Sequence, residues 1–328
     1  MAKRDRIVTL PPDVRINPCV APLSESVSWA DEGLGVDEAW KLSQGEGVIV
    51  CSLDTGCDVY HPDLDGAILD AKDFTGSRFG FGDRHGHGTH VAGLVGARMG
   101  NNVGIRGIAP KCKLLIAKVL GDNGAGSDTS VAQGLLWGHE RGARIFCLSL
   151  GGASDMPATL AAAKEIVKGG GKFIFAAAGN DGGRVNKPAA YEQCVSVGAY
   201  DNHGNLTEFT SKTGRLDIVG PGVEMMSTLP GNRYGTMTGT SQANPVVGAI
   251  GALAVAKHDV DKGQSDLVSV ADMREHLQKS ATDSGRGYKL ANARRMLERH
   301  GVEVPVVADV WLPKIPLGKN WAVCRRAT

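Results

Sequence analysis

The chain has almost no net charge and lacks a long hydrophobic segment. Its 36 lysine and arginine residues nearly balance 35 aspartate and glutamate residues, which leaves a formal net charge of +1 over 328 residues. This balance argues against nucleic acid or an anionic membrane as the main partner. No run of roughly 18 apolar residues appears, so a transmembrane helix is not expected. The charged residues 1–6 are not followed by the hydrophobic region of a signal peptide.

The seven cysteines also lack the spacing of a metal site. Cys51 and Cys57 have neither a second close pair nor histidines at zinc spacing. Cys51 and Cys147 lie in apolar runs, where the expected role is that of a small buried hydrophobic side chain. Free thiols without an export signal predict a reducing, cytoplasmic setting.

Apolar runs recur along the middle of the chain, with helical patterns between them. With 42% hydrophobic residues, the chain can bury a sizeable core. We expect strands near residues 48–53, 114–119, 145–148, 173–178 and 195–198, and helices near 90–99, 129–140, 158–168 and 245–257. Near-continuous apolarity is typical of parallel strands buried on both faces. The alternation predicts an α/β fold with a doubly wound, mainly parallel sheet and helices on both faces.

The two ends of the chain differ from this middle part. Residues 1–27 are charged and rich in proline, which predicts an N-terminal extension ahead of a globular domain over residues 28–299. Residues 300–328 form a C-terminal tail, read either as an added strand or as an arm of an oligomer such as a homodimer.

Four polar residues fall at the ends of the expected elements. Asp54 ends the first strand and Asn180 follows a later one, at the edge where doubly wound sheets bind ligands. His87 lies in a glycine-rich loop, and its unperturbed pKa of about 6.5 suits a base. Ser241 opens a small-residue helix, whose N-terminal N–H groups favour a developing oxyanion. Taken singly, each residue also has an ordinary role in a turn or a helix cap.

Three other readings of these segments stay open or are disfavoured. Asp83 is a rival carboxylate for orienting a base. His85 and His90 could not easily converge with His87 on a metal, and no carboxylate has the usual spacing. The glycine-rich residues 121–126 lack the Lys-Ser/Thr that follows a phosphate-binding loop.

The order Asp54, His87, Ser241 and the motifs around these residues resemble the subtilisin family of serine proteases. The chain is most similar to the intracellular subtilisins in residues 53–58, 61–64, 149–152 and 227–230. The resemblance covers roughly residues 30–298, so it implies that the domain over 28–299 is a subtilisin-like catalytic domain. It implies a serine endopeptidase of broad specificity that acts on proteins and peptides through an acyl-enzyme. A peptide ligase on the same fold and a catalytically silent binding module are the alternatives.

The resemblance also implies roles for individual residues. Ser241 would be the nucleophile, His87 the base and Asp54 its orienting acid, with Asn180 and the Ser241 N–H binding the oxyanion. A substrate strand would lie between two segments of the chain. Their residues are Gly124, Ala125 and Gly126 on one side, and Ser149, Leu150, Gly151 and Gly152 on the other.

Calcium and an inhibitory extension are further implications of the resemblance. One calcium site would use Asp63 and Asn101 with the carbonyls of Met99, Val103 and Ile105. A weaker second cation site would use Asp217 with the carbonyls of Ala189, Tyr191 and Cys194. Residues 1 to about 20, including Leu10-Pro11-Pro12, would block the cleft until they are removed, as in a zymogen.

Overall fold

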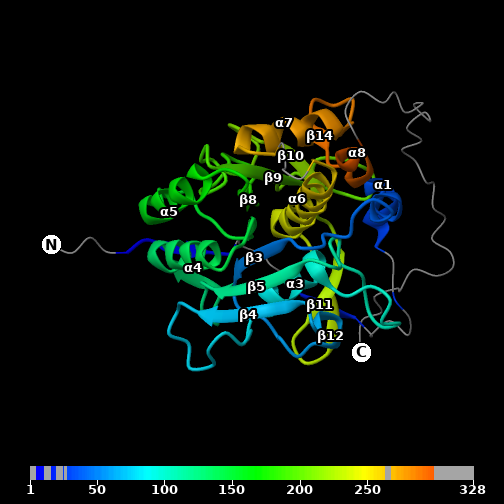
Figure 1. Cartoon of the computed structure of the whole chain (residues 1–328). Coiled ribbons are helices and arrows are strands. Elements are labelled where there is room, and N and C mark those ends of the chain that lie inside the picture. Colours follow the sequence, from blue (N-terminus) through cyan, green and yellow to red (C-terminus); the bar gives the residue numbers. More distant parts are fainter. Residues whose placement is uncertain (1–4, 11–15, 20–24, 26–27, 263–266, 299–328) are drawn as a thin grey trace.

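The computed structural model describes residues 5–10, 16–19, 25, 28–262 and 267–298 (Figure 1). The C-terminal tail over residues 300–328 lies outside these residues, as do Pro11 and Pro12 of the N-terminal extension.

A nine-stranded sheet forms the centre of the described part of the chain, in the order β13-β14-β10-β9-β8-β7-β3-β5-β4. All neighbouring strands are parallel except β13 and β14. The strands are β3 (Ile49–Asp54), β4 (Ile68–Asp73), β5 (Lys113–Lys118), β7 (Ile145–Leu148), β8 (Phe173–Ala177), β9 (Cys194–Tyr200), β10 (Ile218–Pro221), β13 (Thr282–Asp283) and β14 (Lys289–Leu290). The predicted doubly wound, mainly parallel fold is thereby confirmed.

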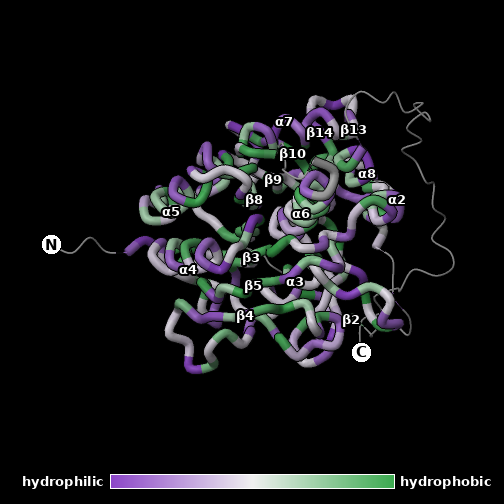
Figure 2. The backbone as a smooth tube through the Cα atoms, in the orientation of Figure 1, coloured by the Kyte–Doolittle hydropathy of each residue, from purple (hydrophilic) through white to green (hydrophobic). Residues whose placement is uncertain are grey.

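Helices cover both faces of this sheet (Figure 1). They are α1 (Trp29–Leu34), α2 (Val36–Trp40), α3 (His87–Gly96), α4 (Asp128–Glu140), α5 (Pro157–Lys168), α6 (Thr240–Lys262), α7 (Val270–Ser280) and α8 (Ala293–Leu297), with a 3-10 turn, η1 (Pro62–Leu64). One hydrophobic cluster joins the sheet to α3, α6, α7 and α8, and a second joins it to α4 and α5. Figure 2 shows hydrophobic residues concentrated in the strands and in α6, and hydrophilic residues on the outer helices. Cys51 and Cys147 are fully buried within these clusters, as expected.

Two small sheets flank the large one. β11 (Met225–Leu229) and β12 (Arg233–Met237) form an antiparallel pair, to which β2 (Asn17–Cys19) adds a third strand. β1 (Ile7–Thr9) pairs antiparallel with β6 (Ala125–Ser127). Both β1 and β2 come from the N-terminal extension, so parts of it are packed on the domain.

The strands next to one another end at the same edge of the sheet. Asp54 of β3 lies opposite Lys118 of β5, and Leu148 of β7 lies opposite Leu53 of β3 and Ala176 of β8. Residues that directly follow these strands therefore meet at one edge.

Helices α3 and α6 begin earlier than their hydrophobic patterns predict. The expected starts were residues 90 and 245, whereas α3 starts at His87 and α6 at Thr240. Pro245 is thus inside α6, where it cannot donate to the carbonyl of Ser241 four residues earlier. That carbonyl instead accepts a hydrogen bond from Ser149 Oγ at 2.8 Å, which satisfies the group that proline leaves unpaired.

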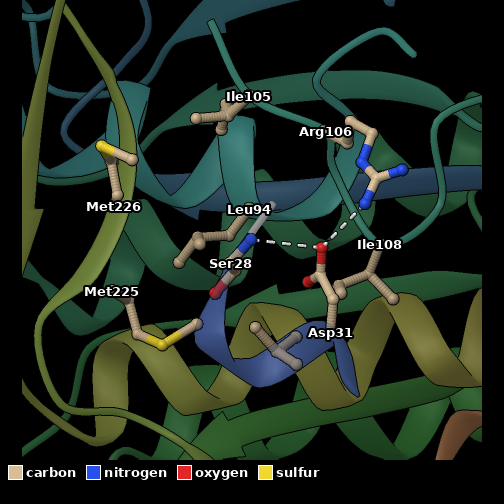
Figure 3. Close-up of a pocket in the computed structure, with 9 residues that line it drawn as sticks. Ser28, Asp31, Leu94, Ile105, Arg106, Ile108, Met225 and Met226 are labelled. Atoms are coloured by element: carbon tan, nitrogen blue, oxygen red, sulfur yellow. Dashed lines mark hydrogen bonds and ion pairs between the residues drawn. The ribbon is translucent and has the colours of Figure 1, made fainter. Parts of the chain in front are cut away.

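A buried carboxylate ties α1 to the segment after residue 105 (Figure 3). Asp31 Oδ2 accepts hydrogen bonds from the Ser28 N–H at 3.2 Å and from Arg106 Nη2 at 3.3 Å. Burial raises the pKa of Asp31 to about 6, although the guanidinium of Arg106 acts in the opposite direction. Desolvation therefore outweighs the ion pair at this position.

Within the described segments, no helix combines the length and the apolar character needed to cross a lipid bilayer.

Candidate active site

Asp54 and His87 form a buried hydrogen-bonded pair at the carboxyl edge of the sheet. Asp54 is the last residue of β3, and His87 is the first residue of α3. His87 Nδ1 lies 2.7 Å from Asp54 Oδ1, and both side chains are almost completely buried. His87 Nε2 has no hydrogen-bond partner among the described residues. Because the Asp54 carboxylate accepts a hydrogen bond from Nδ1–H, the neutral ring carries its proton on Nδ1 and Nε2 is its basic nitrogen.

A second buried carboxylate, Asp83, holds the loop before α3. Its Oδ1 accepts hydrogen bonds from Thr55 Oγ1 at 2.9 Å and from the N–H groups of His85 and Gly86 at 3.0 and 2.8 Å. Its Oδ2 accepts from the N–H and the hydroxyl of Thr89 at 2.9 and 2.7 Å. Asp83 thus joins the end of β3 to the first turn of α3.

The sequence leaves open whether Asp54 or Asp83 orients the base, and these contacts distinguish the two carboxylates. Asp54 contacts the His87 imidazole, whereas Asp83 contacts the backbone on either side of it. We therefore regard Asp83 as a residue that positions His87. Four of its five hydrogen bonds are to residues within six positions, and the fifth is to Thr55, which is 28 residues away along the chain.

Two glycines allow the approach of α3 to β3. Gly86 has φ of 97°, in the left-handed region that glycine adopts without steric cost. A Cβ on Gly88 would lie 2.1 Å from the carbonyl oxygen of Gly56, so no other residue fits there without a shift of the backbone. The Gly88 N–H instead donates to Thr55 Oγ1 at 2.9 Å.

Ser241 is the second residue of α6 and lies at the same edge of the sheet. Its Oγ donates a hydrogen bond to the carbonyl of Ser149 at 3.2 Å, while Ser149 Oγ donates to the carbonyl of Ser241. The hydroxyl is thus paired with Ser149 rather than with His87 in this structure. Rotation about the Cα–Cβ bond moves a serine Oγ between staggered positions, and catalytic hydrogen bonds are often unformed without substrate.

Asn180 lies three residues beyond β8 and is held by Thr240, a residue for which we predicted no role. Asn180 Oδ1 accepts from the N–H of Thr240 at 2.9 Å and from its hydroxyl at 2.8 Å. Because the Thr240 N–H can only donate, the acceptor oxygen of Asn180 must face it. The Nδ2 amide points to the other side, where a Cβ on Gly239 would lie 2.9 Å from it. The donor group of Asn180 is therefore next to the residues that lead into Ser241.

The three histidines around α3 do not form a metal cluster. The ring centroids of His85 and His87 are 6.3 Å apart, and burial lowers the pKa of His85. His90 Nε2 bonds to the carbonyls of Met225 and Gly235, and burial lowers its pKa to about 3. His90 therefore ties α3 to β11 and β12 as a neutral donor. The described residues include no group of three or more His, Cys, Asp or Glu placed to hold a metal ion.

The two predicted substrate-binding segments both contact the N-terminal extension. β1 pairs antiparallel with β6 over Ala125–Ser127, and the Leu10 N–H donates to the Gly124 carbonyl at 3.0 Å. On its other edge, the Thr9 carbonyl accepts from the Gly151 N–H at 3.3 Å. Residues 7–10 therefore lie as a strand between the two segments, where a peptide substrate was expected.

The side chains of this strand alternate between buried and exposed. Val8 and Leu10 are 1% and 8% exposed, whereas Ile7 is 77% exposed. Arg6 adds a hydrogen bond from Nη1 to the Asp155 carbonyl at 2.7 Å. Alternation of this kind is expected of a strand with one face on the protein.

A pocket of about 100 Å³ lies next to Asn180 and is lined by Thr9, Gly151, Asp181 and Asn186 among others. Asp181 accepts a hydrogen bond from Ser211 Oγ at 2.5 Å, and this contact lowers the pKa of the carboxyl. The wall of the pocket thus carries a negative charge at neutral pH.

Lys118 is a further residue that the sequence did not single out. Its side chain is fully buried at the end of β5, where Nζ donates to the Thr55 carbonyl at 2.5 Å and pairs with Asp122 at 3.0 Å. It connects the strand end that carries Asp54 to the loop leading to β6. An apolar run that ends in lysine gives no sign of such a contact.

The residues of the predicted calcium site gather around Asp63. This carboxylate is fully buried, with Oδ1 2.7 Å from Asn101 Nδ2 and Oδ2 accepting from the Ile105 N–H and the Tyr234 hydroxyl at 2.8 and 3.0 Å. The Asn101 Oδ1 accepts from the Val103 N–H at 3.1 Å, so a calcium ion would have to displace the Asn101 amide from both partners before this oxygen could bind it. Together with main-chain carbonyls of residues 99–105, the side-chain oxygens of Asp63 and Asn101 are hard oxygen donors of the kind that calcium prefers. The residues fit such an ion.

The residues of the second predicted cation site do not fit a metal ion. Arg215 Nη2 donates to the carbonyls of Ala189, Tyr191 and Cys194 at 3.0, 2.6 and 3.1 Å. Arg215 Nη1 lies 3.0 Å from Asp217 Oδ2. Every oxygen expected to bind a metal is therefore engaged by one guanidinium group. The prediction from resemblance has to be corrected at this point, because it took no account of Arg215.

The geometry of this edge defines a class of enzyme before any comparison. An imidazole oriented by a buried carboxylate, and a serine at a helix N-terminus on the same edge of the sheet, are the groups with which serine hydrolases build an activated nucleophile. Residues 45–295 match the sequence model of the subtilase family. The chain belongs to the subtilase family, and it is a serine endopeptidase that acts on protein substrates.

Its relatives include intracellular and other subtilases. It is 42% identical to the major intracellular serine protease of Bacillus subtilis (strain 168) over 232 residues, which cover 67% of this chain and 72% of the relative. It is 40% identical to the intracellular serine protease of Paenibacillus polymyxa over 228 residues, covering 66% and 69%. It is also 40% identical to subtilisin Savinase of Lederbergia lenta over 264 residues, covering 80% and 94%.

Proposed function

We propose that Asp54, His87 and Ser241 are the catalytic triad of this protease and that Asn180 is an oxyanion donor. The observation that carries this proposal is the 2.7 Å contact between the buried Asp54 and His87, with Nε2 unpaired within the described residues. The hydrogen bonds from Thr240 to Asn180 support the second role, because they direct the Asn180 amide nitrogen toward Ser241.

The reaction follows from these contacts. When a peptide enters, Ser241 Oγ exchanges the Ser149 carbonyl for His87 Nε2 and gives its proton to that nitrogen as it attacks the scissile carbonyl. Asp54 stabilises the imidazolium that forms. The oxyanion receives hydrogen bonds from Asn180 Nδ2 and the Ser241 N–H. His87 then gives the proton to the leaving amine, and a water molecule hydrolyses the acyl-enzyme by the same route in reverse.

Protein cleavage by purified enzyme tests this assignment. Casein should be hydrolysed, a serine-directed acylating inhibitor should stop hydrolysis, and its mass should be found on Ser241. Ser241→Ala should remove both effects, whereas Ser154→Ala, at an exposed position, should retain them. Labelling of a different serine would contradict the assignment. Transfer of the acyl group to an added amine in preference to water would favour a ligase instead.

We also propose that residues 7–10 inhibit the enzyme by occupying its substrate cleft. Their hydrogen bonds to Gly124 and Gly151 support this, because they use the main-chain groups that a substrate strand would use. A substrate peptide and the extension cannot both pair with these main-chain groups at the same time. Removal of the extension would thus activate the enzyme.

The alternation in this strand provides a matched pair of variants. Val8→Asp places a charge at a buried position and should release the strand, which raises activity toward a short peptide. Ile7→Asp changes an exposed position and should leave activity unchanged. Deletion of residues 1–10 should match Val8→Asp. Equal rates for all four proteins would refute inhibition by this segment.

A calcium ion at Asp63 belongs to the same proposal. Asp63 and Asn101 would hold it with the carbonyls of Met99, Val103 and Ile105. When bound, the ion would neutralise the buried carboxylate and fix the loop that follows α3. It has no part in the bond-breaking steps.

An intracellular setting is supported by the names of two relatives, which are intracellular serine proteases. A homodimer through residues 300–328 stays a prediction from the sequence, since these residues lie outside the described part of the chain.

A further inference from the structure

Arg215 lies at the centre of a ring of main-chain oxygens. Its Nη2 donates to three carbonyls, those of Ala189, Tyr191 and Cys194, all within 3.1 Å. The two N–H bonds of Nη2 are therefore shared among three carbonyls of one turn, which are oxygens of the kind that also bind calcium. The side chain is 30% exposed, so it is anchored at the protein surface with its charged end turned inward.

Two arginines and one aspartate bring charge to this place. Asp217 is 4% exposed, and its Oδ2 contacts Arg215 at 3.0 Å and Arg274 of α7 at 3.3 Å. Arg274 Nη2 also donates to the carbonyls of Glu192 and Cys194, each at 2.6 Å. Two guanidinium groups thus share one buried carboxylate. A metal ion added there would be repelled by both and would have to displace one of them.

The turn held by Arg215 supports the wall of the substrate cleft. Asn186, which lines the pocket next to Asn180, precedes this turn, and its N–H donates to the Ala178 carbonyl at 2.8 Å. Lys187 exchanges two hydrogen bonds with Gly152, both at 2.9 Å. Gly152 directly follows Gly151, which contacts the strand in the cleft. The segment from Asn186 to Cys194 is therefore fixed to the cleft at one end and to Arg215 at the other.

We propose that Arg215 is a built-in cation that positions this wall of the cleft and makes the turn over residues 189–194 independent of any metal ion. The guanidinium supplies the charge and the donors that a bound ion would otherwise supply. It is a positioning residue, since it acts on substrate binding through the turn. Only the kinetic test of this proposal depends on the active site proposed above.

The first test measures thermal unfolding in the Ser241→Ala background, with calcium held constant and saturating. Arg215→Ala should lower Tm by about 5 °C, because it removes four hydrogen bonds of the guanidinium, including the one to the Ala189 carbonyl, while Asp217 and the Cys194 carbonyl keep their contacts with Arg274. Guanidinium ion at about 20 mM, or sodium, should restore part of this loss by binding the vacated oxygens. Choline chloride at equal ionic strength should not, because choline is too large. The parent should respond equally to sodium and choline.

Two further variants serve as controls. Arg184→Ala removes an exposed arginine of the same loop and should behave like the parent. Arg215→Lys keeps the charge with fewer donors, so its Tm should lie between those of the parent and Arg215→Ala. If Arg215→Ala fails to fold, Tm in sodium and in choline is compared for Arg215→Lys instead.

The kinetic readout separates positioning from general stability. In the active enzyme, Arg215→Ala should raise KM for a peptide substrate while kcat is retained, and guanidinium should lower KM again. The proposal is overturned if Arg215→Ala lowers Tm without a specific response to guanidinium or sodium. It is also overturned if the parent responds to sodium as strongly as the variant does. Because the thermal test uses inactive protein, an error in the assigned triad would not affect it.

Discussion

At the catalytic edge of the sheet, Asp54 has one carboxylate oxygen, Oδ2, without a hydrogen-bond partner among the described residues, and His87 Nε2 is equally unpaired. In the loops farther from this edge, both oxygens of the buried Asp63 and the Oδ2 of the buried Asp217 accept hydrogen bonds, from N–H, amide, hydroxyl or guanidinium donors. A buried polar atom without a partner costs free energy, and in the mechanism that we propose His87 Nε2 gains a partner when it takes the proton of Ser241. The saturated carboxylates instead hold chain segments in place.

Asp83 is closest to the catalytic edge yet belongs to the saturated group, since its two oxygens accept five hydrogen bonds. We therefore distinguish the carboxylates by the hydrogen-bond partners of their oxygens and not by their distance from His87. The four predictions below test this difference between Asp54 and the saturated carboxylates.

The largest effect is expected for Asp54→Asn. The amide cannot stabilise the imidazolium and favours the wrong tautomer of His87, so kcat should fall by about 10⁴-fold. Tm of the folded protein should change little, because Asp54 makes few contacts. Steady-state kinetics with a peptide substrate and thermal unfolding would measure both. Asp65→Asn, at an exposed position, is the control. A large loss of Tm in Asp54→Asn would show that Asp54, like the other buried carboxylates, holds chain segments in place.

Asp83→Asn should affect both activity and stability. An amide at this position offers Nδ2 to groups that now donate to a carboxylate, so at least two hydrogen bonds to a charged acceptor are lost, a cost of about 3 kcal/mol. A small displacement of His87 should lower kcat by about 10²-fold. The pH at which activity is half-maximal should stay the same, since the Asp54–His87 contact is retained. A shift of that pH as large as the one caused by Asp54→Asn would assign Asp83 to the chemistry.

Calcium removal should change stability more than chemistry. If calcium occupies the Asp63 site at about 100 times its Kd, chelation costs about 2.7 kcal/mol, which lowers Tm by about 4 °C for a chain of this length. Below the unfolding range, kcat should be unchanged by short exposure to a chelator. Asp63→Asn should abolish the response of Tm to calcium in the Ser241→Ala background. If Tm of this variant still responds to calcium, the ion binds at another part of the chain.

The smallest effect is expected for the buried Asp31. Its pKa is raised from 3.8 to about 6 in the folded state, so the native protein binds more protons than the unfolded chain between these values. Stability from this group is present at low pH and is lost as pH rises through the folded pKa. Between about pH 4 and pH 6 the free energy of unfolding should fall by about 2 kcal/mol relative to Asp31→Asn. Denaturant titrations of both proteins in the Ser241→Ala background, across this range, provide the measurement. Parallel curves would show that Asp31 titrates normally.

Much of the fold could be predicted because it has a local signature. Apolar runs matched β3, β5, β7, β8 and β9 to within a few residues. Asp54 and Asn180 could be assigned to one edge because they follow buried strands, and parallel strands end together. The hydrophobic pattern alone placed the starts of α3 and α6 too late, because their first turns are polar, whereas the small residues around Ser241 predicted the helix N-terminus that α6 has at Thr240.

The parts that were missed depend on contacts between distant segments. Thr240 orients Asn180 from 60 residues away, and Arg215 reaches carbonyls of residues that are 21 to 26 positions earlier. Such contacts have no periodicity and no characteristic spacing. The second cation site was predicted from resemblance in its oxygen donors alone, and the arginine that satisfies them is only recognisable once the turn is folded.

The strand formed by residues 7–9 is covalently joined to the domain whose cleft it enters. Its rebinding after release is therefore intramolecular, and diluting the protein does not weaken it. Tethers of modest length give effective concentrations in the millimolar range. If the strand inhibits the enzyme as we propose, a substrate peptide reaches Ser241 only when its concentration, divided by its own Kd, exceeds the effective concentration of the strand divided by the Kd of the strand. Low-abundance or weakly bound peptides would thus be spared by the full-length chain, whereas a single cut between the strand and the domain would expose them to attack.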